Sequence, residues 1–145
     1  MIKKITIVLI LACSLAGCLH SQDFTSPDTV SVQSGKLTLR GLLWRPAGYG
    51  PFPTVIFCHG SYGGSDTIHD PNQQISLLGP VFASKGYIYL GLLRRGVGLS
   101  SRQGVNSTEL MDKAFKEKGQ EGRNEVQLQQ LQTDQLMDII SGLKF

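Results

Sequence analysis

Residues 53–64 of this 145-residue chain read PTVIFCHGSYGG. The proline can begin a strand but cannot occupy the middle of a sheet. After Thr54 the run is apolar without polar alternation, which is typical of a strand buried on both faces of a parallel sheet. The run ends at His59-Gly60 and enters a loop with three glycines among five residues. Such a loop can bring backbone N–H groups close to a ligand. The alternative interpretation of the same residues is an ordinary glycine-rich loop at a strand end.

The segment before this strand predicts a β-hairpin. Residues 29–32 alternate polar and apolar side chains, Ser34-Gly35 supplies a turn, and residues 37–44 resume the strand character. A dense cluster of proline and glycine over residues 45–53 then ends the hairpin.

The segment after the glycine loop predicts a helix and a second strand. Apolar residues recur at helical spacing over residues 73–85. We expect Gly79-Pro80 to kink or split this helix and Gly86 to end it. Residues 87–93 form another apolar strand, so the two strands and the helix have the spacing of a parallel crossover. The sequence therefore indicates an α/β fold.

Two helical segments are expected in the last third of the chain. Residues 106–118 carry an apolar face, and Asn106 is suited to cap their N-terminus. Gly119 and Gly122 interrupt the pattern, and residues 123–143 resume it as a second helix or helical segment.

The first residues resemble an export signal. Two lysines are followed by an apolar segment over residues 5–15, which is shorter than the roughly 20 residues that a transmembrane helix needs. The stretch LAGC over residues 15–18 resembles the bacterial lipobox, in which the cysteine, here Cys18, becomes lipidated. We expect a signal peptide over residues 1–17, a polar tether over 18–28, and a lipid-anchored protein of the bacterial envelope, on the periplasmic or outer-membrane face. A plain secretory signal is the alternative.

Charge and cysteine content exclude several classes of function. Loss of the two lysines with the signal would lower the net charge from +3 to +1, which gives no electrostatic case for nucleic acid as a partner. Cys13 would leave with the signal peptide and Cys18 would carry lipid, so only Cys58 would remain as a thiol. No intramolecular disulfide could then form. Because Cys58 lies in the apolar run, we expect it to be a small buried hydrophobe and not a nucleophile.

A second motif makes a family resemblance specific. Residues 95–100 read RGVGLS and look like the R-G-x-G-x-S turn after the fourth strand of many α/β hydrolases. Together with the hairpin and the His59-Gly60 loop, residues 29–145 resemble the N-terminal half of dienelactone-hydrolase-like and related esterases and peptidases. The resemblance implies a partial α/β-hydrolase domain: a β-hairpin followed by β-α-β and helices, incomplete as a hydrolase sheet.

The resemblance also implies roles for individual residues. The backbone N–H of Ser61, with Tyr62 as the second choice, matches an oxyanion-hole donor, which stabilises negative charge during acyl transfer. The resemblance makes His59 and Gly60 loop-shaping residues, and His59 is not a general base. It likewise gives a structural role to the turn residues, Arg95, Gly96 and Ser100. The implied substrates are small-molecule or peptide esters and amides, with no cofactor. No metal site is expected, because residues 59, 66, 69 and 70 fit no metal-ligand spacing.

The catalytic residues of that family are missing from the sequence. None of the serines lies in a G-x-S-x-G motif, and no histidine follows residue 69, although the triad histidine comes last in the family. The resemblance therefore implies the N-terminal fragment of a serine hydrolase, inactive by itself, and we expect a truncated product. The alternative is a non-catalytic envelope lipoprotein that uses the half-fold for binding or assembly.

Overall fold

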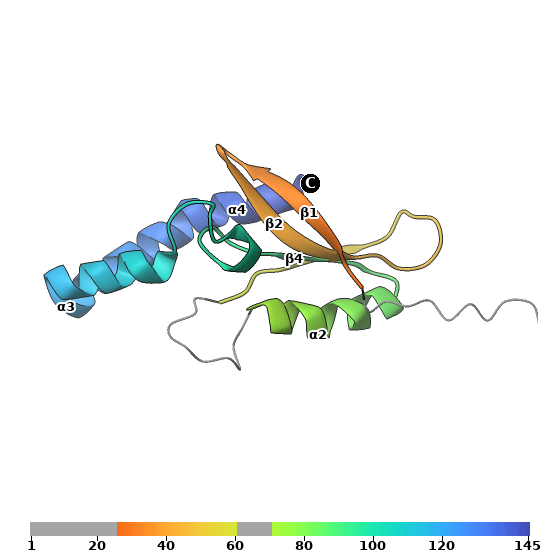
Figure 1. The fold of residues 1–145 in the computed structure, drawn as a ribbon, viewed down its shortest axis with the longest axis horizontal. Coiled ribbons are helices and arrows are strands. Elements are labelled where there is room, and N and C mark those ends of the chain that lie inside the picture. Colours follow the sequence, from red (N-terminus) through yellow and green to blue (C-terminus); the bar gives the residue numbers. More distant parts are fainter. Residues whose placement is uncertain (1–25, 61–70) are drawn as a thin grey trace, which may run out of the picture.

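The computed structural model describes residues 26–60 and 71–145 of the chain, and Figure 1 shows their arrangement. The elements are β1 (Asp28–Ser34), β2 (Leu37–Trp44), β3 (Thr54–Phe57), α2 (Pro71–Ser84), β4 (Ile88–Leu92), the short 3₁₀ helix η2 (Gly98–Ser100), α3 (Ser107–Gln132) and α4 (Asp134–Leu143). The expected signal peptide and most of the tether lie outside the described residues.

The strands form one mixed sheet in the order β1-β2-β4-β3. β1 and β2 pair antiparallel from Asp28 opposite Leu43 to Ser34 opposite Leu37, so the predicted hairpin is confirmed. Gly35 takes a φ of 57° in its turn, a conformation that glycine adopts without steric cost. β2 is antiparallel to β4, and β4 is parallel to β3. This mixed sheet with its helices is compatible with the expected α/β class.

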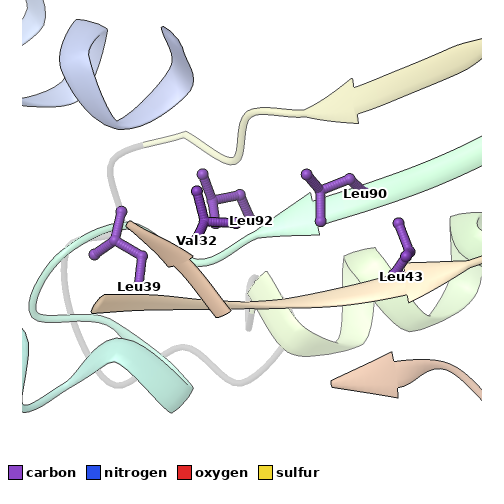
Figure 2. Close-up of a cluster of buried hydrophobic side chains, with 5 residues drawn as sticks. All are labelled: Val32, Leu39, Leu43, Leu90 and Leu92. Atoms are coloured by element: carbon purple, nitrogen blue, oxygen red, sulfur yellow. The ribbon is translucent and has the colours of Figure 1, made fainter. Parts of the chain in front are cut away.

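Helices cover the two faces of the sheet. One face carries a core of five aliphatic side chains, shown in Figure 2: Val32, Leu39, Leu43, Leu90 and Leu92. Gly142 of α4 approaches Leu90 and Leu92 on this face. The other core combines Trp44, Tyr89 and Leu93 with Ile75 and Ala83, which belong to α2. The sheet therefore lies between α2 and α4.

The expectation that the strand after Pro53 is buried on both faces is wrong. β3 lies at the edge of the sheet, and its last three residues are only half-buried while Thr54 is exposed. The central parallel strand is β4, in which Tyr89 and Leu90, on opposite faces, are both buried. The two strands have similar apolar sequences, and only β4 has a neighbour on each side.

Of the two alternatives expected for Gly79-Pro80, a kinked or a split helix, the split is wrong, because α2 continues through Pro80. Ile75 and Ala83, on either side of the proline, are both buried in the core, and this packing offsets the hydrogen bond that proline cannot make. Gly86 ends the segment as predicted. It has a φ of 86°, and its N–H donates to the carbonyl of Ala83.

The last third of the chain is helical with boundaries that differ in part from the prediction. Asn106 caps α3 as expected, and its side chain accepts from the N–H of Thr108 at 2.8 Å. Gly119, with φ 68° and ψ −154°, breaks the helical geometry as expected, whereas Gly122 is a buried helical residue. The predicted single helix over 123–143 is wrong, because Thr133 separates α3 from α4. The Thr133 hydroxyl donates to the carbonyl of Gln129 at 2.8 Å, and Thr133 has non-helical φ and ψ.

Within the described part of the chain, no helix combines the length and apolar character needed to cross a membrane.

Candidate functional site

Two loops meet at the carboxyl ends of the parallel strands. His59-Gly60 follows β3, and Arg94-Arg95-Gly96 follows β4. Ligands of open α/β sheets bind at this edge, because the loops after neighbouring parallel strands diverge there. Residues 59–60 and 94–96 are therefore the candidate site.

His59 is a buried, neutral histidine with both ring nitrogens engaged. Nε2 accepts from the backbone N–H of Arg94 at 3.2 Å, and Nδ1 lies 3.1 Å from the carbonyl oxygen of Gly60. These partners assign the proton to Nδ1, which donates to Gly60. Burial, followed by the positive charge of Arg94, lowers the pKa of His59 from 6.5 to about 4. The ring therefore ties the two loops together and has no nitrogen left to act as a general base.

Arg94 is the main site residue that the sequence pattern does not predict. Its side chain is buried, with an exposed fraction of 9%. Nη1 donates to Oε1 of Gln135 in α4 at 2.7 Å, and Nη2 donates to the carbonyl of Gly60. Nε has no hydrogen-bond partner among the described residues. The double arginine after an apolar strand was the available signal, although the pattern cannot tell which arginine points inward.

Arg95 attaches the same turn to α4. Its Nη2 and Nε donate to the two carboxylate oxygens of Asp138 at 2.6 and 3.0 Å, and its Nη1 lies 2.9 Å from Asp134. Asp138 is fully buried and also accepts from the hydroxyl of Ser34 at 2.6 Å. The hydrogen bond to Asp138 is the largest contribution raising the pKa of Arg95. Arg95 thus binds side chains of the protein itself, and no pattern in the sequence indicates Asp138 as its partner.

Gly96 and Ser100 close the turn after β4. The Ser100 hydroxyl is buried, donates to the carbonyl of Leu93 at 2.9 Å and accepts from the N–H of Arg40 at 2.8 Å. The Gly96 N–H lies 3.1 Å from the carbonyls of both Ser100 and Gln103. Gly96 has a φ of 71°, and a Cβ there would lie 2.4 Å from the backbone nitrogen of Asn106. Only glycine fits this position, so the turn is rigidly connected to β2 and α3.

Cys58 differs from its predicted environment, because it is exposed and not a buried hydrophobe. Among the strands that the structure describes, β3 has no neighbour on its outer side to cover the residue. Atoms around the thiol still raise its pKa through desolvation, against a smaller opposing effect of Arg94. The thiol therefore stays protonated near neutral pH, which keeps its nucleophilicity low.

The expected oxyanion donors, Ser61 and Tyr62, lie outside the described residues, as does the lipidation candidate Cys18. The described ranges contain no group of three or more His, Cys, Asp or Glu side chains that could hold a metal ion. The structure does bring together His59, Gly60 and the Arg94–Gly96 turn.

Comparison with known proteins gives a relationship over part of the chain. The chain is 34% identical over 88 residues to the protein named esterase FrsA of Shigella boydii serotype 18 (strain CDC 3083-94 / BS512), over 61% of this chain and 18% of that protein. Esterase FrsA of Escherichia fergusonii is likewise 34% identical, over 89 residues. This similarity supports an esterase relationship. The chain spans less than a fifth of the length of these relatives. No family model matches, and no solved structure matches.

Proposed function

We propose that this chain supplies the oxyanion side of a serine hydrolase that acts on ester or amide bonds of small molecules or peptides. The observation that carries the proposal is the joined pair of loops after β3 and β4, in a chain similar to esterase FrsA. Acyl transfer places negative charge on a carbonyl oxygen, and backbone N–H groups held in advance stabilise that charge. Ser61 is the proposed donor because it follows His59-Gly60 directly. Tyr62 is the second choice.

The nucleophile and its base come, in this proposal, from sequence other than these 145 residues. The printed sequence contains no G-x-S-x-G motif, and His59 has both ring nitrogens engaged. Within residues 26–60 and 71–145, β3 is an edge strand that pairs with β4 alone, so its outer side has backbone groups available to pair with a further strand. In the family that the sequence resembles, that next strand precedes the nucleophile.

A serine-directed fluorophosphonate probe tests this division of roles. The purified full chain should take up no probe, and its turnover of activated esters should equal that of a Ser61→Ala variant. Covalent labelling of any serine of this chain, with turnover, would overturn the proposal. The second measurement is to sequence the reading frame beyond codon 145, where a continuation in frame or after a frameshift should encode G-x-S-x-G.

A non-catalytic envelope lipoprotein is the second candidate, and one observation favours it. Leu136, Met137 and Leu143 of α4 are all exposed, so the helix presents apolar side chains that a binding partner could cover. A clean stop codon after residue 145 in many independent genomes would favour this function over the hydrolase.

Attachment to the bacterial envelope through Cys18 is part of the same proposal. Several acyl chains on one cysteine would hold the protein on a membrane, whereas a single chain binds only marginally. Metabolic labelling with an alkyne fatty acid should tag the wild-type chain and fail with Cys18→Ala. Cys13→Ala and Cys58→Ala are the matched controls and should keep the tag. Equal labelling of Cys18→Ala would remove the anchor from the proposal.

A further inference from the structure

A cleft of about 300 Å³ lies on the α4 face of the sheet, where β3 and β4 begin. We propose that this cleft binds a single-chain fatty acid, with the alkyl chain inside the cleft and the carboxylate on Arg45. The inference does not depend on the proposed hydrolase function. The cleft lies at the amino ends of β3 and β4, whereas the loops of the candidate site follow their carboxyl ends.

The cleft exists because α4 covers only part of this face of the sheet. Near the start of α4, Asp138 accepts a hydrogen bond from Ser34 of β1. Near its end, Gly142 approaches Ile56 of β3. The helix then ends at Leu143, so the strand residues beyond that point line an open space and not a helix contact.

The walls of the cleft are apolar. Leu43 and Leu90, both labelled in Figure 2, contribute from β2 and β4, and both are buried. Ile56 and Ile88 also line the cleft and are half-buried. Spaces with such walls give water few polar partners and take up apolar molecules instead. An alkyl chain in the cleft is stabilised in proportion to the apolar surface that leaves water.

Arg45 supplies the charge that selects an anionic head group. Of the lining residues that the structure describes, it alone carries a charge. Its Nη1 lies 2.9 Å from a carboxylate oxygen of Asp28, and both side chains are exposed. An exposed ion pair of this kind contributes little free energy, so a ligand carboxylate can replace Asp28 at small cost. The planar guanidinium is suited to bind that carboxylate through two parallel hydrogen bonds.

The volume of the cleft favours one alkyl chain over a segment of protein. Pockets that bind small molecules begin at about 300 Å³, which is the volume of this cleft. A helix with its side chains is about 10–12 Å across and needs more space. A phospholipid carries two alkyl chains, which also need more space than one. One cation beside one apolar space therefore matches a molecule with a single anionic head and a single tail.

Nuclear magnetic resonance of the methyl-labelled full chain, kept in solution by an amphipathic polymer, tests the site. Octanoate should shift the methyl signals of Ile56 and Ile88 in a saturable manner. From hexanoate through octanoate to decanoate, the Kd should fall about fourfold for each added methylene, because each methylene buries further apolar surface. Octanol should bind about threefold more weakly than octanoate, and octylamine more weakly still, because Arg45 repels its charge.

Two variants of the Arg45 ion pair should change the affinity in opposite directions. Arg45→Gln should raise the Kd of octanoate about threefold and leave that of octanol unchanged. Asp28→Asn, which frees Arg45, should lower the Kd of octanoate by a similar factor. Arg102→Gln removes an exposed arginine that does not line the cleft, and as the matched control it should change neither Kd.

A second pair of variants tests the apolar wall. Leu143→Asn removes an exposed wall residue without disturbing the core, and it should raise the Kd of both octanoate and octanol about fivefold. Leu136→Asn changes an exposed leucine of the same helix that does not line the cleft, so both Kd values should stay unchanged.

Several outcomes would overturn the inference. One is an affinity that does not rise with chain length, and another is equal affinity for octanoate and octylamine. Equal Kd values in Leu143→Asn and Leu136→Asn would place the ligand elsewhere. An apparent Kd that rises with protein concentration would assign the cleft to a second copy of this chain. Shifts of the same methyl signals with phosphatidylcholine vesicles alone would assign it to a membrane surface.

Discussion

His59 makes the stability of the folded chain depend on pH. The folded state binds a proton at this ring only near pH 4, whereas the unfolded chain does so near pH 6.5. Between these values the unfolded state binds more protons, so acidification through this window favours unfolding. From pH 7 to pH 5 the wild type should lose about 2 kcal/mol more free energy of unfolding than His59→Gln. Urea unfolding of both proteins at the two pH values measures the difference, and equal losses would contradict the assignment of a neutral, buried ring.

Asp138 is the second residue on which the site depends. It is fully buried and compensates Arg95, which would be left without its closest charge partner in Asp138→Asn. We expect that variant to lose about 3 kcal/mol of unfolding free energy, as for other broken buried ion pairs. Asp112→Asn removes an exposed carboxylate 3.5 Å from Arg123 and should cost less than about 0.5 kcal/mol. Similar losses in the two variants, by urea unfolding at pH 7, would show that the Asp138 pair is not buried in solution.

At the scale of elements, α2 is held on the sheet by a close approach that only glycine permits. A Cβ at Gly79 would lie 2.2 Å from the ring of Trp44, which is itself buried. Gly79→Ala should therefore destabilise the protein by about 3 kcal/mol through overpacking, despite the higher helix propensity of alanine. Ser76→Ala, at an exposed position of the same helix, is the control and should be neutral or slightly stabilising.

Trp44 reports this packing directly, because it is the sole tryptophan of the chain. Its fluorescence should shift toward the red in Gly79→Ala and stay unchanged in Ser76→Ala. A Gly79→Ala protein with wild-type emission and stability would mean that α2 lies farther from β2 than the structure shows.

At the scale of the whole molecule, the edge strand β3 borders a cleft. A cleft of about 300 Å³ is lined by Ile56 of β3, Ile88 and Leu90 of β4, and the C-terminal Leu143 and Phe145. β3 itself carries no charged residue that would discourage pairing with another strand. Apolar surface next to an open edge favours association with another chain.

We therefore expect the segment from Ser21 to Phe145, produced without lipid, to self-associate. Analytical ultracentrifugation should show oligomers whose fraction falls in Thr54→Lys, because a lysine on the edge opposes strand pairing. Thr29→Lys, an exposed position on the opposite edge strand β1, should leave the fraction unchanged. A soluble monomer with a cooperative thermal transition and slow amide exchange in β4 would contradict this expectation and favour the stand-alone binding protein.

The features that can be predicted from the amino-acid sequence are local ones. The alternation in β1 and β2, the glycine at the end of α2 and the Asn106 cap of α3 each depend on residues a few positions apart. Their hydrogen bonds close within a single turn or hairpin, so the pattern of side chains is sufficient to predict them. The motifs at His59-Gly60 and Arg95-Gly96 also marked the two loops that the structure brings together.

Tertiary structure alone decided which strand is central and which arginine holds the loop. β3 and β4 are both apolar runs, and periodicity does not record how many neighbours a strand has. Hydrogen bonds from the Arg94 side chain join Gly60 and Gln135, and these three residues come from separate segments of the chain. α4 buries its polar Gln135 and Asp138 and exposes Leu136 and Met137, against its own amphipathic pattern. It does so because buried Arg94 and partly buried Arg95 need hydrogen-bond acceptors, and satisfying these cations outweighs covering two apolar side chains.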